Sequence, residues 1–167
     1  MRSGGEQRSL ARRATGSQEL EGQKVNTIYF GGGTPSLLTA EEISSLLKSI
    51  EQHYNIAKNA EITLEANPDD LSEEKIIELS KTSVNRLSIG IQSFFDEDLQ
   101  MMNRAHNAKE SESCLSIAKH YFKNITIDLI YGIPGLSNKR WKENLQKTFD
   151  HGIPHISSYA LTVEEKT

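Results

Sequence analysis

Residues 28–36 read Ile-Tyr-Phe-Gly-Gly-Gly-Thr-Pro-Ser, an apolar run that leads directly into three consecutive glycines. Glycine has no Cβ, so this backbone can turn sharply and a ligand can approach it closely. No Lys-Ser/Thr pair follows, as in a P-loop, and no Gly-x-Gly-x-x-Gly is present, which disfavours a nucleoside triphosphate site. The stretch predicts a strand that ends in a binding loop. The alternative is a tight strand-to-helix turn that holds no ligand.

Outward from this loop, short apolar runs alternate with helical patterns. The expected strands are Val25 to Phe30, Glu61 to Ala66, Asn85 to Ile91, Ile125 to Tyr131 and His155 to Leu161. Each run is rich in Ile, Leu or Val and is bounded by Gly, Pro, Asn or Asp. This alternation is typical of an α/β fold with a parallel sheet, either an arc of an α/β barrel or a doubly wound sheet. The pattern alone does not choose between them.

Capping signals mark the helices that follow the first four strands. Thr39 and Glu42 have capping-box spacing. They precede one apolar stripe formed by Ile43, Leu46, Leu47, Ile50 and Tyr54. Ser72, Asn107 and Ser137 are the expected caps of the next three helices. Both architectures bind ligands at the carboxyl ends of the strands, so polar residues there are the best candidates for a site.

Length, charge and cysteine content bound the class of protein. The 167 residues suffice for one domain or part of one, but they are few for a complete α/β barrel. A net charge of −4 with interspersed signs argues against a nucleic-acid partner. The single cysteine excludes a disulfide framework and favours a cytoplasmic location. No apolar run approaches the roughly 20 residues of a membrane span.

Residues 1–24 differ in composition from the rest. Their charged residues are Arg2, Arg8, Arg12, Arg13 and Lys24 against Glu6, Glu19 and Glu21. Few residues in this stretch could pack into a core, so we expect a disordered or non-native N-terminal segment. An Arg-rich organelle address is the alternative. Residues 25–167 then form the partial α/β core.

Two acidic residues lie on predicted strands. Glu65, near the end of its strand, could accept hydrogen bonds from an ammonium group or a ribose; the alternative is a solvated charge. Asp128 lies within an apolar run, where a carboxylate would be costly in a sheet buried on both faces unless something pairs with it. We therefore expect near Asp128 either a ligand or a structural partner, with Arg86 and Arg104 as the candidates.

Other polar residues give weaker signals on their own. Gln92 follows an apolar run and Arg104 lies near an expected helix end, so surface roles are the default. The Arg104 guanidinium would nevertheless suit a carboxylate if it turned inward, because its fork can bind both oxygens. Cys114 is predicted to be a buried, inert thiol. The five histidines are predicted to be solvated or capping residues, without metal-ligand spacing.

Five segments together resemble one family, the radical S-adenosylmethionine (SAM) proteins around oxygen-independent coproporphyrinogen III oxidase. In order along the chain they are residues 31–36, 61–68, 85–94, 103–106 and 127–134. The resemblance runs from about residue 25 to the end and implies a partial (β/α) barrel. Residues 156–164 are more similar to the haem-chaperone branch of the family than to the true oxidase branch. Fragments of a true coproporphyrinogen III oxidase and non-catalytic SAM-binding α/β domains are the alternatives.

The resemblance implies that SAM is the cofactor and that porphyrin or haem is a partner. The positions that it assigns to SAM are Gly32, Gly33, Thr34, Glu65, Gln92, Arg104, Asp128 and Ala160. A zwitterionic methionine end, a ribose and an adenine need backbone polar groups, carboxylates, a cation and an apolar strand edge, all of which these positions can supply.

The chain departs from the family at the iron–sulfur cluster. Family members hold a [4Fe–4S] cluster with a Cys-x-x-x-Cys-x-x-Cys triplet before the glycine loop, whereas the one cysteine here, Cys114, follows that loop. We expect that these residues include no catalytic residue or metal ligand and do not perform radical chemistry by themselves. The first βα unit of the barrel and the C-terminal domain of the family are also expected to be missing.

Overall fold

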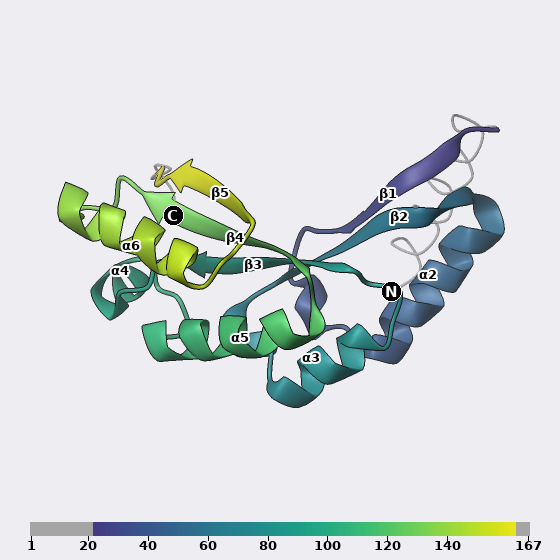
Figure 1. Ribbon diagram of the computed structural model, residues 1–167, viewed down its shortest axis with the longest axis horizontal. Helices are drawn as coiled ribbons and strands as arrows, with labels where there is room; N and C mark the ends of the chain where they lie inside the picture. The colour runs from purple at the N-terminus through teal and green to yellow at the C-terminus, as the bar shows by residue number, and fades with distance from the viewer. Residues whose placement is uncertain (1–21, 163–167) are drawn as a thin grey trace, which may run out of the picture.

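The computed structural model describes residues 22–162, which form one curved parallel sheet covered by helices on one face (Figure 1). The strands are β1 (Lys24–Phe30), β2 (Asn55–Ala66), β3 (Arg86–Gln92), β4 (Asn124–Tyr131) and β5 (His155–Ala160), in the order β1-β2-β3-β4-β5. A doubly wound sheet would reverse its strand order and carry helices on both faces. Sequential order with helices on one face identifies an arc of a barrel, as the family resemblance predicted.

The outer layer contains five α-helices among the described residues. They are α2 (Ala40–His53), α3 (Glu73–Ser80), α4 (Asp96–Met101), α5 (Ala108–Tyr121) and α6 (Asn138–Asp150), with 3₁₀ turns η1 (Pro35–Leu37) and η2 (Pro68–Asp70). The predicted capping box is present, since the Glu42 amide donates to Thr39 Oγ1 at 3.1 Å and the Thr39 amide donates to Glu42 Oε2 at 2.8 Å. Asn107 forms a second capping box with Glu110, and the Ser72 and Ser137 caps are confirmed.

One strand and one helix differ from the sequence prediction by more than a single residue at an end. β2 begins at Asn55 rather than Glu61, because its first residues also pair with β1. The register then shifts, since Val25 pairs with Ile56 whereas Thr27 pairs with Glu61. The extra residues of β2 form an irregularity that strand patterns do not signal. The short helix α4 was not predicted, since its six residues are too few to show an apolar period and three of them are acidic.

The core lies between the sheet and the helices. On β3, Leu87, Ile89 and Ile91 are completely buried. Successive side chains of a strand point to opposite faces, so Ser88 and Gly90 belong to the face without helices. Pairing across the sheet carries this division to the neighbouring strands. The helix-free face therefore receives Glu65 of β2, Ser88 of β3 and Asp128 of β4.

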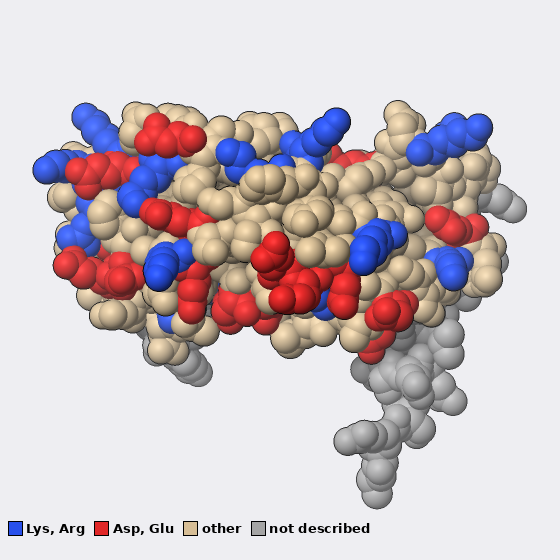
Figure 2. Space-filling view, turned by 60° about the horizontal axis from the view of Figure 1, so that its bottom comes forward, with Lys and Arg blue, Asp and Glu red and all other residues tan. Residues whose placement is uncertain are grey.

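The helix-bearing side carries charges of both signs. Figure 2, turned so that the helices come toward the viewer, shows Lys and Arg interspersed with Asp and Glu. Phosphate binding requires clustered basic residues, and this face of the described residues lacks a continuous basic surface. Among residues 22–162, no helix is long and apolar enough to cross a membrane.

We predict that Leu87→Ala lowers the free energy of unfolding by about 2–5 kcal/mol, because it leaves a cavity in the core. Leu87 is completely buried, whereas Leu37 is 70% exposed. Leu37→Ala is therefore the matched control and should change the stability by no more than about 0.5 kcal/mol. Urea unfolding followed by circular dichroism measures both; equal effects would contradict the assigned core.

Candidate functional site

A cavity of about 200 Å³ lies at the carboxyl edge of the sheet. Of the eight residues predicted to bind SAM, six line it: Gly33, Thr34, Glu65, Gln92, Arg104 and Asp128. The other lining residues are Pro35, Ser36, Ala66, Asn67, Ser88 and Gly90. Parallel strands bring their carboxyl ends to the same edge of a sheet. Side chains separated by many residues in the sequence thus converge on one small, polar space.

The glycine loop is fastened to β2 through Glu65. The Gly32 amide donates to Glu65 Oε2 at 3.1 Å, and the Tyr29 hydroxyl donates to Oε1 at 2.7 Å. Gly32 and Gly33 have φ angles of +78° and +63°, which glycine adopts without a steric penalty. Each carboxylate oxygen keeps a further lone pair, so Glu65 can hold the loop and still accept from a ligand.

We predict that Tyr29 ionises at an unusually high pH. Partial desolvation, followed by its hydrogen bond to Glu65, raises the pKa of this phenol to about 12. An ultraviolet titration should show one tyrosine that ionises after the others, and Tyr29→Phe should remove that step. Tyr121→Phe, at an exposed tyrosine outside the cavity lining, is the control and should leave the late step in place.

Gly90 lies directly against the side chains of two predicted residues, Gln92 and Arg104. A Cβ atom at this position would lie 2.9 Å from Gln92 Nε2 and 3.5 Å from Arg104 Nη2. Gln92 has a φ angle of +65°, an uncommon backbone conformation for a residue other than glycine. The absence of a side chain at Gly90 thus leaves room for the Gln92 amide and the Arg104 guanidinium, and a larger residue would fill this space.

Arg104 turns inward, so the default surface role is wrong for this residue. Its Nη2 donates to Asn67 Oδ1 at 2.9 Å. The expectation of a solvated or capping histidine is likewise wrong at His106, which is buried, with Nε2 3.1 Å from the Ile91 carbonyl oxygen. The segment after α4 folds back onto the end of β3. This tertiary contact has no local sequence signal.

Asp128 is half-buried and does not have the arginine partner suggested by the sequence. Arg86 instead pairs with Glu61, at 2.8 Å between Nη1 and Oε1, and Arg104 binds Asn67. Burial, and next the negative charge of Glu65, raise the pKa of Asp128, while the Ser157 hydroxyl and Arg86 oppose this rise. A carboxylate left in this state is suited to hydrogen-bond donors brought by a ligand.

We predict that Asp128→Asn stabilises the ligand-free protein at pH 7. A raised pKa means that the folded state holds the proton more tightly than the unfolded state, so ionised Asp128 opposes folding at neutral pH. The gain should be present at pH 7 and should shrink as the pH falls toward the usual value of 3.8. Thermal unfolding at several pH values tests this; a variant less stable than the parent at pH 7 would contradict it.

Two predicted positions lie outside the cavity lining. Gly32 contributes through its bond to Glu65, and Ala160 lies at the end of β5, in register with Tyr131. Sequence reasoning missed Ser88 and Gly90 as lining residues, although the two-residue period of β3 could have found them. Asn67 was also missed, and its only local signal was its place at the end of a strand before Pro68.

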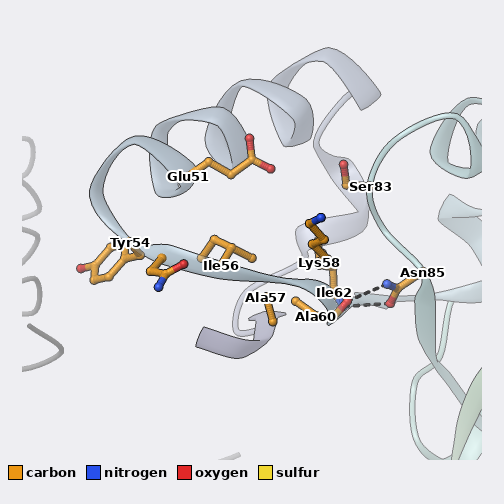
Figure 3. A pocket seen from close by; sticks show the side chains of 10 residues that line it. Glu51, Tyr54, Ile56, Ala57, Lys58, Ala60, Ile62, Ser83 and Asn85 are labelled. Carbon is orange, nitrogen blue, oxygen red and sulfur yellow. Dashed lines mark hydrogen bonds between the residues drawn. The ribbon is translucent and has the colours of Figure 1, made fainter. Parts of the chain in front are cut away.

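A larger cavity of about 580 Å³ lies between the end of α2, the first half of β2 and the segment before β3 (Figure 3). The Asn85 side chain there donates to the Ala60 carbonyl and accepts from the Ile62 amide, both at 2.8 Å. The Asn85 side chain therefore satisfies backbone groups in the irregular part of β2. The cavity also lies away from the carboxyl edge, where this fold binds ligands.

The model of the radical SAM superfamily matches residues 2–148. The chain belongs to the radical SAM superfamily. This confirms the family predicted from the five segments. Heme chaperone HemW of Lactococcus lactis is 40% identical over 151 residues, which cover 90% of this chain and 40% of that protein. Heme chaperone HemW of Escherichia coli is 35% identical over 148 residues, which cover 88% and 39%.

Two solved structures agree with the architecture. Coproporphyrinogen III oxidase HemN of Escherichia coli, described as a radical SAM enzyme, has a TM-score of 0.78 at 26% identity, over 90% of this chain and 35% of that one. Elp3 of Methanocaldococcus infernus, with a TM-score of 0.75 at 23% identity over 95% of this chain and 42% of that one, supports the fold alone. The chain spans about 40% of the length of the HemW proteins that it matches.

The radical SAM superfamily implies both SAM and a [4Fe–4S] cluster, and the residues of this chain do not fit the cluster. Cys114 is the one cysteine of the sequence. It is buried on α5, and burial raises the pKa of its thiol to about 12. Within the described residues, no group of three His, Cys, Asp or Glu side chains is placed to hold a metal ion. One cysteine among these 167 residues does not supply the set of thiolates that such a cluster requires.

Proposed function

We propose that the cavity at the carboxyl edge binds SAM. The observation that carries this proposal is the convergence of Glu65, Gln92, Arg104 and Asp128 with the glycine loop around one space. These residues come from β2, β3, the segment after α4, and β4. They combine a guanidinium, two carboxylates and an amide, which match a ligand that carries both charges of an amino acid together with a sugar.

Each end of SAM has a suitable group in this arrangement. The Arg104 fork suits the carboxylate of the methionine end. Glu65 and the loop of Gly32 and Gly33 suit its ammonium group, since carboxylate and carbonyl oxygens accept hydrogen bonds. Asp128 suits the ribose hydroxyls. Ala160 would then lie on the adenine side, at the end of β5.

We further propose that these 167 residues bind SAM without cleaving it. In the family, SAM bound to a reduced cluster supplies the radical. Here the residues orient the ligand and shield it, and they include no set of thiolates for that cluster. The buried free thiol of Cys114 also suits a reducing compartment such as the cytoplasm.

For the whole protein we propose the role of a haem chaperone. Support comes from the HemW proteins, at 35% and 40% identity, against 26% for coproporphyrinogen III oxidase HemN. A chain extended to the length of its relatives should transfer haem to an acceptor protein. Oxidative decarboxylation of coproporphyrinogen III by that chain would favour the oxidase instead.

Calorimetric titration of SAM into the purified chain tests the site. We predict saturable binding that Asp128→Ala weakens about tenfold or more, because it removes hydrogen bonds to a charged group. Asp150→Ala, at an exposed position on α6 outside the cavity lining, should leave the affinity unchanged. If a chain that is folded by circular dichroism gives no binding heat, the proposal is wrong.

A further inference from the structure

We infer that Asn67 positions Arg104, and that this contact sets the selectivity of the cavity for a ligand that carries a carboxylate. The inference rests on the proposed SAM site and deepens it. Asn67 lies in the cavity lining between the end of β2 and η2. Its Oδ1 accepts from Arg104 Nη2 at 2.9 Å.

A chain of hydrogen bonds fixes the orientation of the Asn67 amide. Asn67 Nδ2 donates to Asp70 Oδ2 at 3.4 Å, and Ser36 Oγ donates to the same oxygen at 2.6 Å. The Asn67 backbone amide also donates to Ser36 Oγ at 3.4 Å. An ionised carboxylate only accepts hydrogen bonds, so Asp70 requires the amino group of Asn67 on its side. The carbonyl oxygen of Asn67 is then left to face Arg104.

This orientation matters because guanidinium binds a carboxylate through a planar fork. Asn67 occupies one of the five N–H donors of Arg104 and leaves the others for a ligand. A flexible arginine would have to lose side-chain freedom when the ligand binds, and a prepositioned fork avoids much of that loss. Asn67 therefore acts on the ligand through Arg104 and is a positioning residue.

The backbone that carries Arg104 is held separately from its side chain. His106 lies two residues further on, with Nε2 3.1 Å from the Ile91 carbonyl oxygen and Nδ1 3.6 Å from Asp69 Oδ1. The Nε2 contact holds the segment after α4 against β3, whereas Nδ1 makes no hydrogen bond at its distance from Asp69. Removal of the Asn67 side chain should thus free the guanidinium without displacing the segment.

The test compares SAM with decarboxylated SAM, which lacks only the carboxylate. The unchanged chain should bind SAM more tightly than the decarboxylated compound. Asn67→Ala should weaken SAM binding about tenfold, because Arg104 loses the hydrogen bond that holds its guanidinium in position. It should leave the affinity for decarboxylated SAM unchanged. A residue with a merely structural role would weaken both ligands alike.

Three further variants make the measurement specific. Asn67→Ser keeps a polar side chain that is too short to reach Arg104, and it should show the same selective loss if Asn67→Ala does not fold. In an Arg104→Gln background, Asn67→Ala should have no additional effect on the ratio of the two affinities. Asn138→Ala, at an exposed position on α6 outside the cavity, should change neither affinity.

The outcomes separate this inference from the proposed function. An unchanged affinity ratio in both Asn67 variants would overturn the role of Asn67 and leave the SAM site in place. If the folded, unchanged chain did not bind SAM, the proposed function and the inference would both be wrong. A ratio that falls in the Asn67 variants but not in Asn138→Ala would establish the positioning role.

Discussion

The structure depends on the burial of one face of a parallel sheet against helices. On β3, that constraint places Leu87, Ile89 and Ile91 in the core. Since side chains alternate along a strand, the intervening residues must lie on the other face. In-register pairing extends the division across the sheet, where Glu65 stands opposite Ser88 and Asp128 opposite Ser157. The apolar core thus determines which polar residues can reach the cavity.

The two carboxylates of the cavity are treated differently by their surroundings. Glu65 is restrained by Tyr29 and the Gly32 amide, so it holds the glycine loop as well as facing the cavity. Asp128 is half-buried near that charge, and its pKa is raised. A residue kept in an unfavourable electrostatic setting is a common feature of functional sites. The cavity therefore combines one fixed carboxylate with one that a ligand could stabilise.

The chain belongs to the radical SAM superfamily, and its sheet has the half-barrel form of that fold. The side chains that could bind SAM and those that could bind the cluster differ in number and in position. Polar side chains and glycines surround the cavity, whereas the one cysteine is buried in a helix of the outer layer. For these 167 residues, binding of SAM and binding of the cluster must therefore be tested separately, because the cavity residues and the cysteine lie in different parts of the chain.

Apolar spacing and local hydrogen bonds were enough to predict five strands, four capped helices and the strand positions of Glu65 and Asp128, although not the early start of β2. Tertiary structure decided the strand order and the burial of His106. It also decided the inward turn of Arg104 and its hydrogen bond to Asn67, which joins residues 37 positions apart. Such a pair leaves no periodic pattern, since it forms only after the sheet and the segment after α4 have come together.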